Sequence, residues 1–328
     1  MKVLAGDVGG TNTRLAVCEV VGNEVHRLIE DVVPSGAHAS LEEIVRGFMG
    51  RYQGGQLHVA CFGLPGPVRG RKAQLTNLPW IVDADRLEQA LGLRNVVLVN
   101  DLVANAYGLA ALAPDEVHVL REGVPDPAGN CGLVSAGTGL GHAGLQRIDG
   151  RFFPFATEAG HTDFAPSDDE EARLLQFLRR RYGPHVSWER AVSGPAIPVL
   201  HEFVREEAKA PVPAWLGDGD PSEQITRAAA EGDALAKRAL DLFLGLYGAQ
   251  AGNFALSVLA TGGIYLGGGI APHLVDAITK SRFVERFDDK GRMRSVTELI
   301  PIRIVLDDKA ALQGAALHAA QHSRRGRD

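Results

Sequence analysis

The stretch "VLAGDVGGTNTRLAV" at residues 3–17 decides the fold, because it sets an acid and two glycines between two apolar runs. Alternation of apolar and polar residues predicts one strand near Lys2–Gly6 and another near Asn12–Glu19. No Lys-Ser/Thr follows the glycines, so the turn is not a Walker A loop. A strand follows instead of a helix, which excludes a dinucleotide-binding fingerprint. The sequence therefore predicts a hairpin.

The turn of this hairpin has the groups that a phosphate site needs. Backbone N–H groups around Gly9 and Gly10 can form a nest for an anion, and Asp7 lies where it could hold Mg²⁺ through water. A Gly-Gly turn is also common in plain hairpins. This stretch alone leaves both interpretations open.

The following segments alternate between strand and helix patterns. "SLEEIVRGFMGRY" and "DADRLEQALGL" are typical of capped helices, whereas "LHVACFGLPGPV" is typical of a strand that ends in a loop. Residues 242–275 carry no charge, yet repeated glycines divide them. They predict a buried helix through about Leu259 and then a buried strand, and not a membrane span. The pattern favours an α/β protein.

Length, charge and cysteine content further restrict the class of protein. A chain of 328 residues exceeds the usual size of one core, which favours two lobes. The net charge of -6 argues against nucleic acid as a partner. Three scattered cysteines without a C-x-x-C pair fit a reducing compartment, and no signal peptide is visible. We expect a cytoplasmic protein that binds neither nucleic acid nor membranes.

Two more glycine-rich turns could contact a ligand. Gly137-Thr138-Gly139 lies in "GLVSAGTGLGHAGLQ", which predicts a strand, a turn and a strand, and its backbone could hold a second phosphate. Gly267–Gly269 separates a predicted strand from a helix. Close approach to a ligand and tight packing both explain such glycines. His142, just beyond the second turn, has no role that the sequence assigns.

Polar side chains cluster in three other places. Asn100 and Asp101 end a buried strand, where α/β sheets bind ligands. Asp101 could accept a proton from a hydroxyl that Asn100 orients, or the pair could cap the next helix, or both. "TEAGHTDFAP" and "VSWERAVSGPA" supply Glu158, His161 and Glu189, which suit a polyol better than a metal ion. "LTNLPW" adds the amide of Asn77.

Taken in order, these motifs resemble those of bacterial glucokinases. The segments "GDVGGTNTRLA", "TNLPW", "VNDL", "SAGTGLG", "EAGHTDFAP", "ERAVSGP" and "YLGGGIAP" follow one another over about residues 2–318. This group contains the ATP-dependent hexose kinases of the hexokinase/actin-like superfamily. It is distinct from the zinc-containing ROK sugar kinases, because "HTDFAPSDDEE" lacks the cysteines of their zinc motif.

The resemblance implies a two-lobed actin-like ATPase fold of the ribonuclease H-like type, with a cleft between the lobes. Residues 1–105 and 307–328 would form the small α/β lobe. Residues 106–306 would form the large α/β lobe with helical insertions. It also implies a homodimer.

The resemblance further implies roles for particular residues. ATP would contact Gly6, Asp7, Val8, Gly9, Gly10, Thr11, Gly137, Thr138, Gly139, Gly267, Gly268 and Gly269, and Asp7 would reach Mg²⁺ through water. The sugar would be bound by Asn77, Asn100, Asp101, Glu158, His161 and Glu189, with Asp101 as the catalytic base.

The implied reaction is phosphorylation of glucose at its 6-hydroxyl by MgATP, the first step of glycolysis. Phosphoryl transfer needs positioning and charge stabilisation, which these motifs can supply. A kinase of another hexose or of an amino sugar is the alternative on the same fold. A non-catalytic, sugar-responsive regulator with a DNA-binding helix-turn-helix is disfavoured, because the first predicted strand begins at residue 2.

Overall fold

The computed structural model describes residues 1–75, 78–307 and 309–325, without the side chains of residues 324 and 325. The chain forms two compact units. The first unit comprises Met1–Glu116, Arg151–Ala156 and Asp307–Asp328, and the second unit comprises Val117–Gly150 and Thr157–Leu306. The first unit runs past residue 105, where the family resemblance placed the boundary. That these units act as the two lobes of an enzyme stays a prediction.

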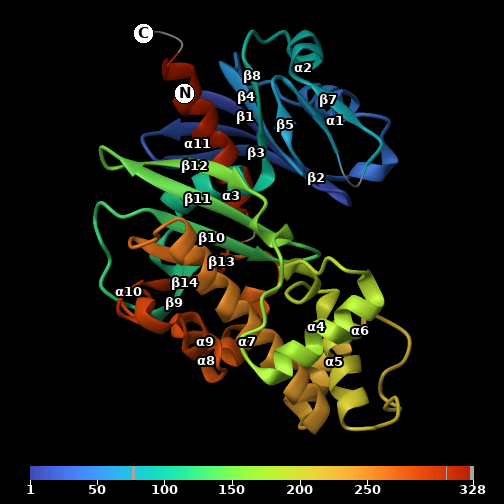
Figure 1. Cartoon of the computed structure of the whole chain (residues 1–328). Helices are drawn as coiled ribbons and strands as arrows, with labels where there is room; N and C mark the ends of the chain where they lie inside the picture. The colour runs from blue at the N-terminus through green and yellow to red at the C-terminus, as the bar shows by residue number, and fades with distance from the viewer. Residues whose placement is uncertain (76–77, 308, 326–328) are drawn as a thin grey trace. The chain divides into compact units, whose positions relative to one another are not determined.

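The first unit is built on a five-stranded sheet with the order β3-β2-β1-β4-β8 (Figure 1). Strands β1 and β2 pair antiparallel, which confirms the predicted hairpin. Strand β4 pairs parallel with β1, and β8 pairs parallel with β4. A small sheet has the order β5-β6-β7. The strands span Lys2–Val8 (β1), Asn12–Val21 (β2), Glu24–Pro34 (β3), Val59–Leu64 (β4), Val68–Arg69 (β5), Lys72–Gln74 (β6), Ile81–Asp83 (β7) and Val96–Asn100 (β8).

Helices cover both faces of the larger sheet. Successive side chains of a strand point to opposite faces, and the apolar side chains on each face are buried by helices. In β1, Leu4 and Val8 enter the core that α1 and α2 complete. Val3 and Ala5 enter the core that α11 completes. The predicted capping of α1 is confirmed, since Ser40 accepts a hydrogen bond from the backbone of the first turn. The helices span Leu41–Met49 (α1), Ala84–Leu91 (α2), Asp101–Gly108 (α3) and Ala310–Arg325 (α11).

Helix α11 returns from the C-terminus and crosses α3 at very short range (Figure 1). A Cβ atom at Gly314 would overlap with the Ala104 carbonyl oxygen. A Cβ atom at Gly108 would overlap in the same way with the Ala310 carbonyl oxygen. Because only glycine allows this approach, the two positions fix α3, whose first residue is Asp101, against the rest of the unit.

The second unit contains strands in the order β11-β10-β13-β14-β9. Strands β10 and β11 pair antiparallel, and β13 pairs parallel with β10. Of β12 (Arg151–Thr157), only Thr157 belongs to this unit. The other strands span Val117–Arg121 (β9), Cys131–Ala136 (β10), Leu140–Ile148 (β11), Gly263–Gly267 (β13) and Ile302–Val305 (β14). The helices span Asp169–Tyr182 (α4), Ala196–Glu207 (α5), Pro221–Glu231 (α6), Ala234–Ser257 (α7), Val275–Lys280 (α8), Phe283–Asp288 (α9) and Arg294–Thr297 (α10).

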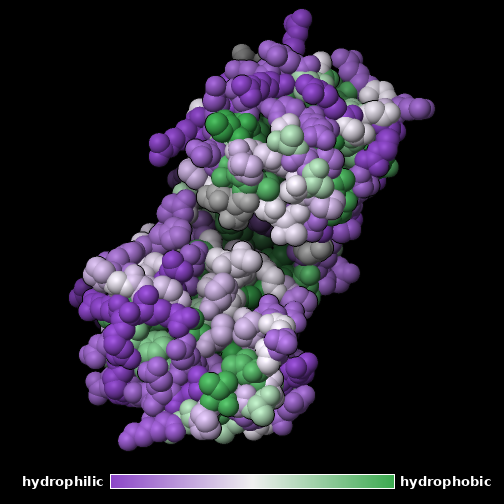
Figure 2. All heavy atoms as spheres, turned by 90° about the vertical axis from the view of Figure 1, so that its right-hand side faces the viewer, coloured by the Kyte–Doolittle hydropathy of each residue, from purple (hydrophilic) through white to green (hydrophobic). Residues whose placement is uncertain are grey.

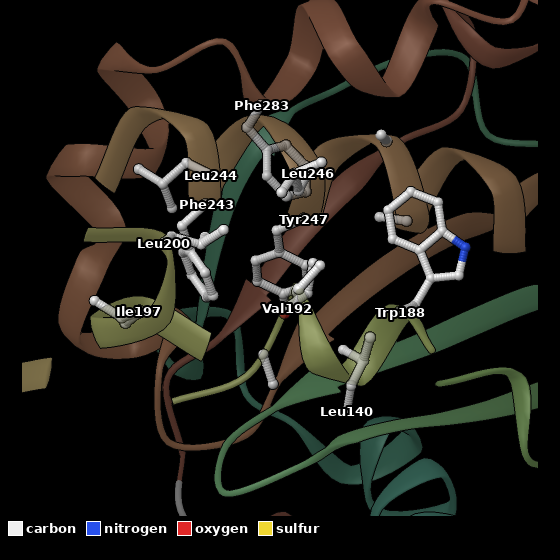
Figure 3. Close-up of a cluster of buried hydrophobic side chains, with 14 of the residues drawn as sticks. Leu140, Trp188, Val192, Ile197, Leu200, Phe243, Leu244, Leu246, Tyr247 and Phe283 are labelled. Carbon is white, nitrogen blue, oxygen red and sulfur yellow. The ribbon is translucent and has the colours of Figure 1, made fainter. Parts of the chain in front are cut away.

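Helix α7 is the centre of the second unit's core (Figure 3). Its Phe243 and Tyr247 are fully buried, and the Tyr247 ring meets the Phe283 ring edge to face at 5.4 Å. The Tyr247 hydroxyl donates to the Val134 carbonyl of β10 at 3.1 Å. The uncharged stretch is thus a buried helix followed by the buried strand β13, as the sequence predicts.

The described helices include none that is both long and apolar enough to cross a membrane. On the face shown in Figure 2 the surface is mostly hydrophilic, and hydrophobic residues gather in small separate groups. The three cysteines, Cys18, Cys61 and Cys131, are all buried and unpaired with one another.

Candidate active site

The turn between β1 and β2 is closed and braced within the first unit. Gly9 donates its backbone N–H to the Asn12 carbonyl at 2.9 Å. The backbone N–H of Ser35 donates to the Thr11 carbonyl at 2.8 Å, and its hydroxyl donates to the Gly9 carbonyl at 2.8 Å. The turn is therefore held in one shape before any ligand arrives. No motif in the sequence marks Ser35 as part of this turn.

Asp7 and Asp101 lie at the same edge of the first unit's sheet. Asp7 pairs in register with Gly63 of β4, and β8 ends at Asn100, directly before Asp101. A Cβ atom on Gly63 would lie 3.6 Å from the Asp101 Cα atom and 3.7 Å from the Gly6 carbonyl oxygen. Because one strand separates β1 from β8, the two backbones are about 10 Å apart. The unit therefore presents two carboxylates at the carboxyl ends of its parallel strands.

Asn100 caps α3, which confirms one of its two predicted uses. Its Oδ1 accepts from the Leu102 N–H at 3.0 Å, and its Nδ2 donates to the Gly66 carbonyl at 3.3 Å. Asp101 also accepts from the Leu102 N–H through Oδ1, at 2.8 Å. The Asp101 carboxylate is partly exposed and begins a helix, where a negative charge is stabilised. Asn77, expected near the sugar, lies outside the described residues.

The second and third glycine-rich turns lie side by side in the second unit. They follow the paired strands β10 and β13, in which Ser135 is in register with Gly267. A Cβ atom on Gly137 would lie 3.9 Å from the Gly269 nitrogen. Gly137 also accepts from the Gly194 N–H at 2.7 Å. Two turns that are far apart in the sequence therefore form one surface.

A cavity of about 870 Å³ opens beside these turns. Thr138 and Gly269 line it at one side, and the first residues of α5 and α6 line it at the other. Ser222 in α6 donates its hydroxyl to the Gly194 carbonyl at 2.9 Å, which ties this wall to the turns. The volume falls within the range of small-molecule sites. The sequence missed Gly194 and Ser222, although "SGP" was among the quoted motifs.

Three of the six residues expected around a sugar gather at the start of β11. Glu158 and His161 place Oε2 and Nε2 3.8 Å apart, and both side chains are mostly exposed. Glu189 accepts from the Leu140 N–H through Oε2 at 3.0 Å. The two loops are joined because the Trp188 N–H donates to the Thr162 carbonyl at 3.0 Å.

Leu140 connects these three residues to the second glycine-rich turn. It directly follows Gly139, on which a Cβ atom would come within 2.6 Å of the Glu189 carboxylate. A Cβ atom on Gly160 would overlap with the Leu140 carbonyl oxygen, so the loop of Glu158 and His161 packs on the same residue. Carboxylates and an imidazole beside a phosphate turn can bind a polyol and orient it toward a phosphate.

Glycine-rich turns beside a cavity are features of phosphoryl-transfer enzymes. Solved structures that resemble this chain include glucokinases. A glucokinase from an Antarctic psychrotroph has a TM-score of 0.88 and is 31% identical, covering 98% of this chain and 99% of its own. A ROK family glucokinase from Streptomyces griseus, solved with glucose and AMPPNP, has a TM-score of 0.66 at 23% identity, covering 98% of this chain and 100% of its own, and shows the shared fold. The expected α/β fold class is confirmed.

The sequence comparisons name the family. The family model described as Glucokinase matches residues 4–322. The glucokinase of Nostoc punctiforme is 38% identical over 97% of this chain and 99% of its own length. The chain therefore belongs to the glucokinase family and is a hexose kinase.

Proposed function

We propose that the chain transfers the γ-phosphoryl group of ATP to the 6-hydroxyl of glucose, giving glucose 6-phosphate and ADP. The observation that carries this proposal is the junction at Leu140, where the Glu189 carboxylate is hydrogen-bonded to the turn that would hold phosphate. Sugar and phosphate groups are thus bound by one short segment. Membership in the glucokinase family supports the same reaction.

Each unit contributes a distinct part of this chemistry. In the second unit, Glu158, His161 and Glu189 bind sugar hydroxyls, and the turns at Gly137–Gly139 and Gly267–Gly269 bind ATP along the cavity. In the first unit, Gly6–Thr11 contacts phosphate, Asn100 and Asn77 contact the sugar, and Asp101 is the base. Asp101 accepts the proton of the 6-hydroxyl as that oxygen attacks phosphorus. Such assistance contributes about 10²–10⁴-fold to the rate.

Asp7 is the proposed contact to Mg²⁺, through water. Mg²⁺ keeps several waters and takes one or two carboxylates together with substrate phosphates, so a single acid beside a phosphate turn fits it. Within the described residues no three His, Cys, Asp or Glu side chains gather into a metal cluster. When bound, the ion would neutralise charge on the transferred phosphoryl group.

The subgroup of the family, the cellular compartment, the pathway and the oligomeric state are also proposals. The lack of cysteine in "HTDFAPSDDEE" supports the bacterial glucokinase group of the hexokinase/actin-like superfamily, and not the ROK type. Three buried cysteines support the cytoplasm as the compartment. Glycolysis as the pathway follows from the proposed phosphorylation of glucose. The homodimer follows from the family resemblance alone, and the mass of the protein in solution would test it.

A sugar panel tests the proposed reaction. ADP release would be measured with MgATP and either glucose, mannose or glucosamine, with water alone as the control. We expect glucose to give the highest kcat/KM and a product phosphorylated at the 6-position. A higher kcat/KM for mannose or glucosamine would favour the alternative hexose or amino-sugar kinase. No turnover with any of them would overturn the proposal.

A further inference from the structure

A buried polar cluster lies behind the loop that carries Glu158 and His161. His142 of β11 is 1% exposed, and its Nε2 lies 3.4 Å from Nε2 of Gln250, which is 3% exposed. The same Gln250 amide nitrogen donates to the Ala159 carbonyl at 3.3 Å. Ala159 stands between Glu158 and His161. The cluster thus reaches the backbone of the loop from inside the unit.

The hydrogen-bonding roles within this cluster follow from the chemistry of its groups. The amide nitrogen of Gln250 can only donate, so Nε2 of His142 must accept and its proton must be on Nδ1. Burial lowers the pKa of His142 to about 3, so the ring stays neutral. A hydrogen bond with the backbone of Leu140 raises the pKa, but by less than burial lowers it. The Gln250 carbonyl accepts from the Asn253 amide at 3.4 Å. Both the amide nitrogen and the amide oxygen of Gln250 are therefore hydrogen-bonded, which fixes the orientation of the side chain.

The backbone of His142 holds the same loop from its other side. The Thr157 hydroxyl donates to the His142 carbonyl at 3.2 Å. The same hydroxyl accepts from the Ala159 N–H at 3.4 Å. The N–H of Ala159 is therefore linked to the backbone of His142 through Thr157, and the carbonyl of Ala159 is linked to the side chain of His142 through Gln250. Only the second link depends on an acceptor in the side chain of residue 142.

We propose that His142 and Gln250 are positioning residues for the sugar, because they fix the backbone of Ala159 and hence the direction of Glu158 and His161. The inference rests on the proposed function of those two side chains. The nucleotide cavity has different walls, and neither His142 nor Gln250 is among its lining residues. Loss of the cluster should therefore weaken glucose binding and leave ATP binding unchanged.

Steady-state kinetics of matched variants tests this proposal. In His142→Leu the acceptor is lost, and we expect the KM for glucose to rise about fivefold to tenfold, as for one lost hydrogen bond. The KM for ATP and kcat should stay close to the wild-type values. His142→Gln restores an acceptor near the position of Nε2 and should recover most of the glucose KM.

Tyr247→Phe is the control for a general loss of core hydrogen bonding. It removes a buried hydrogen bond from α7 to Val134 of β10, at 3.1 Å, without touching the loop. We expect both KM values to be unchanged. If His142→Leu does not fold, Gln250→Met replaces it, since methionine keeps the length of the side chain and removes the donor.

Three results would overturn the inference: an unchanged glucose KM, equal rises in the glucose and ATP KM values, or the same rise in Tyr247→Phe. Wild-type turnover of glucose is measured first. Its absence would overturn the proposed function as well, whereas an unchanged KM in an active series of variants overturns only the inference.

Discussion

Glu189 shows how a backbone hydrogen bond fixes a carboxylate that is proposed to bind the sugar. One oxygen already accepts the Leu140 N–H at 3.0 Å, which fixes the carboxylate beside Gly139. A glucose hydroxyl that donates to Glu189 would therefore meet a group that is already oriented. Preorganisation of this kind reduces the entropy lost when a substrate binds.

His142 gives a prediction about stability at acid pH. Burial lowers its pKa from the ordinary value of 6.5 to about 3, so the folded state does not take up the proton that the unfolded chain binds below about pH 6.5. Stability is therefore lost as the pH falls through that range. Between pH 7 and pH 5 this residue should lower the free energy of unfolding by about 2 kcal/mol.

Denaturant unfolding at the two pH values measures this loss. The free energy of unfolding of His142→Gln should fall less than that of the wild type between pH 7 and pH 5. The comparison uses the change with pH, so a constant effect of the substitution on stability cancels. Equal falls in the two proteins would show that His142 is protonated in the folded state.

The sequence picks out some residues of the candidate site and not others. Asp101 and Asn100 were predictable because they end an apolar strand, and a strand end is visible in the sequence. His142 and Gln250 were not, because 108 positions separate them and only the fold brings them together. Ser35 was missed for the same reason, since its bonds to the first turn join residues 26 positions apart.

Among the elements, α3 and α11 show how packing places a functional group. The first residue of α3 is Asp101, and close contacts at Gly108 and Gly314 fix this helix. The parallel strands β10 and β13 place the second and third glycine-rich turns together in the same way. In both cases a regular element with many contacts carries a short polar segment at its end.

Gly269 offers a prediction about the proposed ATP cavity. No heavy atom lies within 4 Å of where its Cβ would stand, and it lines the cavity. Gly269→Ala should therefore fold normally and place a methyl group where ATP would bind. We expect the KM for ATP to rise about tenfold, as for a moderate overpacking, with the glucose KM unchanged.

Gly217→Ala is the matched control. It lies in the same unit, its Cβ would also meet no atom within 4 Å, and it is not among the residues lining the cavity. This variant should keep both KM values. A rise in the glucose KM of Gly269→Ala without a rise in the ATP KM would contradict the assignment of the cavity.

The sequence predicted long elements well and short ones poorly. Strands β1 and β2 and helix α1 were predicted because periodicity and caps mark them, and helix α7 because a long uncharged run marks it. The short turns at Ala159–His161 and Trp188–Arg190 were seen only as loops, since three residues carry no periodic pattern. Their mutual contact depends on the backbone hydrogen bond between Trp188 and Thr162, which no local signal announces.

At the scale of the whole molecule, the chain leaves the first unit and returns to it. Residues 307–328 rejoin residues 1–116, so the C-terminal helix completes the core behind β1. The first unit supplies the proposed base, the metal contact and part of the sugar and phosphate contacts, and the second supplies the remaining proposed sugar and nucleotide contacts. The family match over residues 4–322 covers both units. We therefore expect no activity from either unit alone.

Turnover of glucose by Asp101→Asn, compared with the wild type at saturating MgATP, tests the central claim most directly. Asparagine keeps the size of the side chain and cannot accept the proton of the 6-hydroxyl. We predict that formation of glucose 6-phosphate falls by about 10²–10⁴-fold in kcat, while glucose still binds. Formation of glucose 6-phosphate at the wild-type rate by this variant would contradict the account.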